Sequence, residues 1–329
     1  MATPPTVSVI IPAYNYGRFI GATLRSVQAQ TLEAWEVLVV DDGSTDDTAQ
    51  IVSAVSAADP RIRCVTQANS GLSAGRNRGL RETSAPLVQF LDADDLIGPD
   101  KLRHQARLLD SLVNVDLVYG VTRYFRDGEA PQSASWEREL AKVTASGEEL
   151  VAALIENNIM AVQAPLIRRS LLGRVGEFDT SLRALEDWDF WIRCALSGAT
   201  FLFDDSGGPA CSSYVRLHDS SMTNKREGML RIEIDARRRY HAELPEALRR
   251  RNLHRIRETE ADIGVREALS GRPRQGALKL LRSGCSERRL RWLVLGVLAP
   301  GLGSAPGRRA LESWRRLKTR WRLRKGSPE

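Results

Sequence analysis

Carboxylate side chains follow two short apolar runs in this chain. Asp92 and Asp94 come directly after the apolar run 88–91, and Asp42 comes after the apolar run 37–40. The carboxyl ends of parallel strands meet at one edge of an open α/β sheet, so residues that follow such strands can converge on one ligand. The types and spacing of these residues therefore predict a ligand site at the edge of a sheet.

Asp92 and Asp94 lie one residue apart on a predicted loop, where alternate side chains can point at one ligand. Hard oxygen donors on a short loop suit Mg²⁺ or Mn²⁺, which keeps several waters and takes its remaining ligands from a substrate diphosphate. Such a metal neutralises a phosphate leaving group. The alternative is a turn that only caps the helix expected after Pro99, but the other motifs favour the metal site.

Three further features suit a nucleotide. Asp42 can accept a hydrogen bond from a base or a ribose hydroxyl, although it can instead cap the following helix. Tyr14, close to Pro12, can offer an aromatic face to a base, or it can be a partly buried strand-end residue. The segment 69–77 combines glycines with Arg76, which can meet phosphates at a helix start. It lacks the Lys-Ser/Thr ending of a P-loop, which disfavours an ATPase or kinase of that type.

Two segments further along carry groups for proton transfer and anion binding. Glu186 and Asp187 open a predicted helix, where a carboxylate can cap the helix or, if it faces a pocket, deprotonate an acceptor hydroxyl. The segment 214–218 alternates like a strand and places Arg216 and His218 on one face. A guanidinium beside an imidazole is suited to binding an anion.

The elements that must position these residues are expected to form an α/β fold with a mostly parallel sheet flanked by helices. The predicted strands are nearly continuous apolar runs, which is typical of strands covered on both faces. Their ranges are 7–11, 37–40, 62–65, 87–91 and 117–119. Helices are expected between them and over 185–196, and capping-box patterns at Ser44 and Ser146 predict two helix starts.

Charge divides the chain into two parts. Residues 1–225 hold 21 Lys and Arg and 29 Asp and Glu, whereas residues 226–329 hold 27 and 12. We therefore expect a catalytic domain over 1–225 and a helical, arginine-rich C-terminal extension over 226–329. An acidic front part argues against a nucleic-acid partner, because a phosphate backbone requires a basic track.

The chain shows no sign of export or of a membrane span. Its four cysteines have no CxxC spacing, and the apolar run 7–11 is too short for a signal peptide, so we expect a cytoplasmic protein. Residues 308–325 form an amphipathic basic pattern with Trp314 and Trp321 on the apolar stripe. This pattern suits peripheral association of 285–329 with the anionic inner face of the cytoplasmic membrane. The alternative is a helical cap on the protein itself; the oligomeric state is left open.

In this order, the motifs resemble those of the family 2 glycosyltransferases, inverting enzymes with a GT-A fold that use nucleotide-diphosphate sugars. The resemblance runs from about Val7 to Thr223. Its most specific parts are the segments 7–15, 41–44, 69–77, 92–95 and 186–191. Processive members also carry transmembrane helices and a Gln-x-x-Arg-Trp motif, which are missing here. The resemblance therefore implies non-processive transfer of a sugar, with UDP the expected nucleotide.

The resemblance also implies roles for individual residues. The positions that match nucleotide-binding residues are Pro12, Tyr14, Asn15, Asp42 and Arg76. Asp92 and Asp94 match the metal and diphosphate site, and Asp187 matches the catalytic base. Further donor or acceptor contacts are expected at Asp95, Glu186, Arg216 and His218. The implied partners are a nucleotide-sugar donor and a glycan or lipid-linked acceptor in cell-surface polysaccharide or glycoconjugate synthesis.

Two other classes remain as alternatives. A sugar-nucleotidyltransferase shares the α/β scaffold, but it requires a Gly-rich loop with Lys or Arg directly after its first strand, and residues 12–18 supply none. A non-catalytic sugar-nucleotide-binding protein does not explain three separate acidic motifs. The sugar, the acceptor and the linkage depend on pocket shape, which the sequence does not reveal.

Overall fold

The computed structural model describes residues 4–131, 136–137, 141–219, 226–270 and 272–287 of the 329-residue chain. The chain divides into two compact units, Met1–Asn224 and Lys225–Glu329. The segment 308–325 lies outside the described residues, as does most of 285–329. The two units are described separately below.

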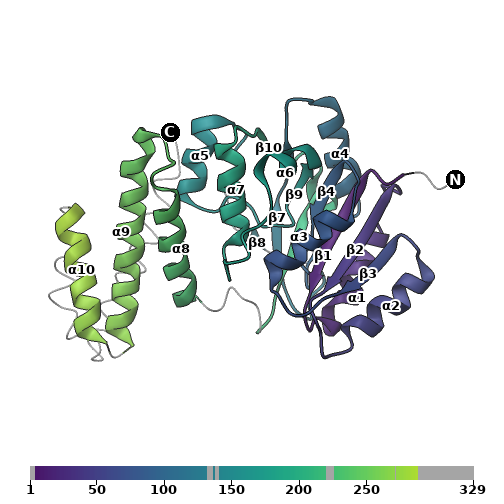
Figure 1. Ribbon diagram of the computed structural model, residues 1–329, viewed down its shortest axis with the longest axis horizontal. Coiled ribbons are helices and arrows are strands. Elements are labelled where there is room, and N and C mark those ends of the chain that lie inside the picture. Colours follow the sequence, from purple (N-terminus) through teal and green to yellow (C-terminus); the bar gives the residue numbers. More distant parts are fainter. Residues whose placement is uncertain (1–3, 132–135, 138–140, 220–225, 271, 288–329) are drawn as a thin grey trace. The chain divides into compact units, whose positions relative to one another are not determined.

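The first unit contains two sheets and the helices around them (Figure 1). Its strands are β1 (Val7–Ala13), β2 (Trp35–Asp41), β3 (Ile62–Thr66), β4 (Leu87–Phe90), β5 (Leu96–Ile97), β6 (Leu117–Tyr119), β7 (Thr122–Arg126), β8 (Trp136–Glu137), β9 (Pro165–Arg168), β10 (Phe201–Phe203) and β11 (Ser213–Leu217). Its α-helices are α1 (Gly17–Gln28), α2 (Thr48–Ala58), α3 (Leu72–Glu82), α4 (Lys101–Ser111), α5 (Gly147–Glu156), α6 (Arg169–Val175) and α7 (Glu186–Leu196).

The larger sheet has seven strands in the order β10-β6-β9-β4-β1-β2-β3. Strands β4, β1, β2 and β3 are parallel to one another, with Ala13 opposite Asp41 and Asp41 opposite Thr66. The carboxyl ends of β1, β2 and β4 therefore lie at one edge, where the sheet delivers the residues that follow each strand. The strands themselves form the core, since every residue of β1 is buried.

All five predicted strands of the front part are confirmed, as β1, β2, β3, β4 and β6. The predicted strand at 214–218 is confirmed as β11, and the helix over 185–196 as α7. The sequence did not predict β9, which lies between β4 and β6 and is antiparallel to both. It also did not predict the smaller sheet, with the order β5-β11-β7-β8, which carries β11 next to the loop after β4.

The prediction that Ser44 starts a helix with a capping box is wrong. Helix α2 begins at Thr48, and its N-cap residue is Asp47, whose side chain makes no capping hydrogen bond. The Ser44 hydroxyl instead accepts a hydrogen bond from the backbone N–H of Asn15, at 2.9 Å. The tertiary contact between the loops after β1 and β2 has displaced the local cap. At Ser146 the start of α5 is confirmed, but the predicted side-chain cap bond is missing.

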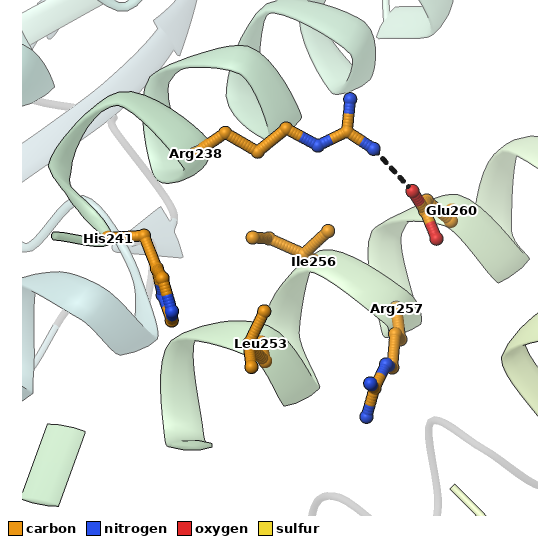
Figure 2. Close-up of a pocket in the computed structure, with 6 residues that line it drawn as sticks. All are labelled: Arg238, His241, Leu253, Ile256, Arg257 and Glu260. Carbon is orange, nitrogen blue, oxygen red and sulfur yellow. Dashed lines mark hydrogen bonds and ion pairs between the residues drawn. The ribbon is translucent and has the colours of Figure 1, made fainter. Parts of the chain in front are cut away.

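The second unit is helical over its described residues, with α8 (Arg226–Tyr240), α9 (Glu246–Leu269) and α10 (Pro273–Glu287). A cavity of about 310 Å³ lies between α8 and α9. Figure 2 shows its apolar side chains, Leu253 and Ile256, below the ion pair of Arg238 and Glu260. None of the predicted site residues lines this cavity. No helix within the described ranges is long and apolar enough to cross a membrane.

Candidate active site

Helix α3, which carries Arg76, packs closely against β1 because two residues of the helix, Gly75 and Gly79, are glycines. A Cβ atom at Gly79 would lie 2.2 Å from Cγ2 of Ile10, and one at Gly75 would lie 3.0 Å from Cβ of Pro12. Only the missing side chains let the helix lie this close to β1. The glycines of 69–77 therefore serve helix packing as well as the loop.

Arg76 joins two acidic motifs that are far apart in the sequence. One guanidinium nitrogen, Nη2, lies 2.8 Å from Oδ1 of Asp92, and Nη1 lies 2.7 Å from Oε1 of Glu186. Its side chain is only 1% exposed. Burial alone would lower the pKa of Arg76, but the charges of Asp92 and Glu186 more than offset it and raise the pKa. A planar donor with two carboxylates fixes their relative positions.

Asp42 is buried and uses both oxygens within the chain. Its Oδ1 accepts hydrogen bonds from Gln67 Nε2 at 2.7 Å and from the Ser70 N–H at 2.8 Å, and its Oδ2 accepts one from the Gly71 N–H at 2.7 Å. The carboxylate therefore shapes the loop after β3. The backbone N–H groups of Ser70 and Gly71 belong to the segment 69–77, which was expected to meet phosphates, but both donate to Asp42.

The loop after β1 presents Tyr14 to solvent. Tyr14 is 45% exposed. Asn15 has a positive φ of 59°, and its Oδ1 accepts a hydrogen bond from the Thr45 N–H at 2.8 Å. Pro12 is buried. Among the predicted nucleotide contacts, Tyr14 is therefore the one with an available aromatic face, and Asn15 holds its loop in place.

Asp92 and Asp94 lie in the turn between β4 and β5. Asp92 Oδ1 accepts from Arg76, and Asp94 Oδ2 lies 2.8 Å from Nε2 of His218. Among the described residues, the remaining oxygens, Oδ2 of Asp92 and Oδ1 of Asp94, have no hydrogen-bond partner. Burial raises the pKa of Asp92, and Asp94 adds to the rise while Arg76 opposes it. Hence each carboxylate keeps one oxygen for another ligand.

These free oxygens suit Mg²⁺ or Mn²⁺. Neither ion needs an all-protein cage, since one or two carboxylates with waters and substrate phosphates suffice. Within the described ranges, no group of three or more His, Cys, Asp or Glu is placed to hold a metal alone. Two carboxylates with one unused oxygen each therefore fit a metal that is held jointly with a diphosphate.

Strand β11 closes over this turn. The Arg216 N–H donates to Oδ1 of Asp95 at 2.8 Å, and Arg216 Nε donates to the backbone oxygen of Asp94 at 3.0 Å. The His218 ring packs on Phe19 with centroids 4.6 Å apart. Arg216 and His218 thus both contact Asp94. The alternation of 214–218 predicted that they share a face, but not that they meet Asp94.

Asp187 lies in the first turn of α7 and is partly buried. Its Oδ2 accepts a hydrogen bond from Asn158 Nδ2 at 3.0 Å, and its Oδ1 accepts one from the Trp188 N–H at 2.7 Å. Burial, reinforced by the charge of Glu186, raises the pKa of Asp187 to about 7. A carboxylate with a pKa near neutrality can take up and release a proton at physiological pH. The residue before this helix start, Leu185, adopts a positive φ of 60°.

The sequence analysis missed two residues of the site. Tyr16 lies close to the acidic turn. Burial, followed by the charges of Asp94 and Asp92, raises the pKa of Tyr16 above its ordinary value. Gln163, which is 2% exposed, donates a hydrogen bond to Oδ2 of Asp95. No local pattern marks either residue, since each reaches the turn from another part of the fold.

Comparisons with known proteins identify the family and the fold. A family model described as "Glycosyl transferase family 2" matches residues 8–172. A putative teichuronic acid biosynthesis glycosyltransferase of Bacillus subtilis is 29% identical over 68% of this chain and 83% of its own length. The succinoglycan biosynthesis protein ExoU of Rhizobium meliloti is 29% identical over 74% and 69%. An alignment with an uncharacterized glycosyltransferase of Rickettsia typhi, 28% identical, covers 67% of this chain and 66% of that protein, just under two thirds.

Two solved structures share the fold. Residues 1–349 of TarS from S. aureus, in complex with UDP-GlcNAc, superpose with a TM-score of 0.64 over 94% of this chain and 92% of that one, at 21% identity. The mannosyltransferase PcManGT of Pyrobaculum calidifontis, in complex with GDP-Man and Mn²⁺, gives a TM-score of 0.58 over 93% and 83%, also at 21% identity. These likenesses establish the architecture of the α/β sheet.

Proposed function

The chain belongs to glycosyl transferase family 2, and from this premise we propose that it transfers one sugar from a nucleotide-diphosphate donor to a hydroxyl group. The observation that carries the proposal is the bridge made by Arg76. Arg76 pairs with Asp92, which belongs to the proposed metal site, and with Glu186, which is the neighbour of Asp187 in the sequence. A leaving-group site and a base for the acceptor then lie on two sides of one guanidinium.

Asp187 acts as the general base of the transfer. Its raised pKa of about 7 allows it to take the proton of the acceptor hydroxyl as that oxygen attacks the anomeric carbon. The bond from the anomeric carbon to the diphosphate oxygen breaks in the same displacement, so the configuration inverts. Asn158 and the first turn of α7 hold the carboxylate in place.

Asp92 and Asp94 would hold Mg²⁺ or Mn²⁺, since each has one oxygen without a hydrogen-bond partner among the described residues. When bound, this ion neutralises charge that builds up on the departing diphosphate. Arg216 and His218 lie against Asp94, and the Arg216 guanidinium adds positive charge on that side of the turn. The GDP-Man and Mn²⁺ complex of PcManGT supports a divalent metal in this fold.

Tyr14 stacks on the nucleobase of the donor. Its ring is exposed at the carboxyl end of β1, next to the loop that Asp42 shapes. Asp42 contributes mainly by holding that loop, since both its oxygens already accept hydrogen bonds. UDP is the first nucleotide to test, because a TarS complex with UDP-GlcNAc shares this fold; dTDP and GDP follow.

The acceptor is a glycan or a lipid-linked saccharide in polysaccharide synthesis. The relatives in teichuronic acid and succinoglycan biosynthesis support this class. A basic C-terminal region, with 27 Lys and Arg in 226–329, favours the surface of an anionic membrane as the place of transfer. Co-sedimentation with anionic vesicles, lost on removal of 285–329, tests this part, and unchanged binding by the truncated chain would contradict it.

The proposed function is tested by the release of nucleoside diphosphate from UDP-, dTDP- and GDP-sugars with Mn²⁺, Mg²⁺ or EDTA. We expect release from one donor that requires metal, and a loss of about 10²-fold in Asp94→Asn, because a metal ligand and its charge are removed. If no donor is hydrolysed and calorimetry detects no nucleotide binding, the protein is not a glycosyltransferase of this kind.

A further inference from the structure

A fully buried lysine lies behind the acidic turn. Lys101, the first residue of α4, is 0% exposed, and its Nζ donates to Oε1 of Gln89 at 2.5 Å and to Oε1 of Gln105 at 2.8 Å. Among the described residues it forms no ion pair, and burial lowers its pKa to about 7. A buried ammonium with only neutral partners is costly to fold, so its partners bear on what it does.

The hydrogen bonds of Lys101 continue towards the site through two glutamines. Gln89 donates from Nε2 to the backbone oxygen of Gln163 at 3.0 Å, and Ser213 Oγ donates to the same oxygen at 2.8 Å. The side chain of Gln163 then donates from Nε2 to Oδ2 of Asp95. Every residue of this hydrogen-bond network is at most 4% exposed, so water does not compete for these bonds.

Asp95 connects this network to strand β11. Its second oxygen, Oδ1, accepts the Arg216 N–H, and this bond holds β11 against the turn at the point where Arg216 and His218 reach Asp94. With both oxygens occupied and 4% exposure, Asp95 is not placed to meet a substrate itself. The position of Asp95 nevertheless fixes the backbone of Arg216, and with it the place of the Arg216 guanidinium beside Asp94.

We infer that Gln163 is a positioning residue of the diphosphate site, because it is the link between the buried Lys101 network and Asp95. The inference rests on the proposed function and adds to it the part of the core that keeps β11 closed over the turn. Groups that orient the first layer of a metal or phosphate site change affinity about 10- to 100-fold when removed.

The test compares Gln163→Leu with Gln30→Leu. Gln30 is the control: it is 6% exposed, and its side chain makes three hydrogen bonds, to the backbone of Ser26, Gly98 and Leu102, whereas the Gln163 side chain makes one, to Asp95. It does not contact Asp95. Both variants bury a leucine in place of a bonded amide, so a general loss of stability affects both, and thermal unfolding measures that loss.

Two readouts separate positioning from stability. Calorimetry with Mn²⁺ and UDP, dTDP or GDP measures affinity, and hydrogen exchange of the peptide over Ser213–Leu217 measures how firmly β11 is held. We expect Gln163→Leu to weaken nucleotide affinity about tenfold or more and to speed exchange in β11, with Gln30→Leu within about twofold of wild type in both. Lys101→Met should shift both readouts in the same direction as Gln163→Leu, by a smaller factor.

Equal exchange and equal affinity in the Gln163→Leu and Gln30→Leu variants would overturn the inference. If β11 exchanges faster in Gln163→Leu while wild-type protein binds none of the three nucleotides, the link from Gln163 to β11 stands and the proposed function is wrong. The two failures are therefore distinguishable in one set of samples.

Discussion

Asp95 and Asp187 are two carboxylic acids of the same site whose pKa values burial raises, yet their surroundings differ. Asp95 is 4% exposed and accepts hydrogen bonds from Gln163 and Arg216 on its two oxygens. Asp187 lies in the first turn of α7 and remains partly exposed. A raised pKa alone does not mark a general base, because the group must also reach the proton of a substrate.

The two residues differ in what their carboxyl groups contact. Asp95 uses its oxygens to hold β11 over the turn, and the like charges of Asp94 and Asp92 add to the rise of its pKa. The pKa of Asp187 is raised by the same cause, burial, but Asp187 remains partly exposed. Variants at the two positions should therefore fail in different ways.

Asp187→Asn has the largest expected effect. Asparagine keeps the size of the side chain and can still accept from Asn158, but it cannot take up a proton from an acceptor hydroxyl. We expect kcat to fall about 10³-fold while donor affinity by calorimetry stays within about twofold. In Asp95→Asn, by contrast, donor affinity should fall more than kcat. A loss of less than tenfold in Asp187→Asn would remove Asp187 as the base.

Arg76→Lys should have the next largest effect, because Arg76 connects the two sides of the site. A lysine offers one compact charge and cannot hold Asp92 and Glu186 together with a planar fork. The loss of one charge-assisted hydrogen bond predicts a fall in kcat/KM of about 10- to 100-fold. The surface variant Arg78→Lys serves as control, since Arg78 pairs with Glu82 on the exposed side of α3. Equal activity of the two variants would contradict the bridge.

The pH profile distinguishes the two carboxyl groups directly. With the pKa of Asp187 raised to about 7, the base is mostly protonated at pH 6 and mostly ionised at pH 8. The rate should therefore rise about tenfold between these values and then level off. The rise should persist in Asp95→Asn and vanish in the residual activity of Asp187→Asn. Loss of the rise in Asp95→Asn alone would exchange the two assignments.

The smallest expected effect is on stability. Asp187 has a folded-state pKa above its unfolded value, so its contribution to stability is present at low pH and is lost as pH rises through about 7. The melting temperature of Asp187→Asn should thus gain on that of wild type between pH 5 and pH 8, by about 2–4 °C for each kcal/mol. An advantage that does not change with pH would argue against the raised pKa.

The sequence predicted the strands of the parallel sheet well, because each is an apolar run with a polar break after it. It did not predict β9, which is inserted antiparallel between β4 and β6. Strand β9 spans only Pro165–Arg168, and helices lie close on both sides of it in the chain. A four-residue strand carries no periodic signal that distinguishes it from a loop or a helix end. The capping pattern at Ser44 was wrong for a related reason: a contact with Asn15 took over the hydroxyl.

The sequence by itself determined which chemical groups the site has, since Asp92, Asp94 and Asp187 follow from strand ends and a helix start. Only the tertiary structure decided what each group does. It turned both oxygens of Asp42 towards the chain's own loop and placed Arg76 between Asp92 and Glu186. Hydrogen bonds and charges act over a few ångströms, and these partners are brought within reach only when distant segments pack together.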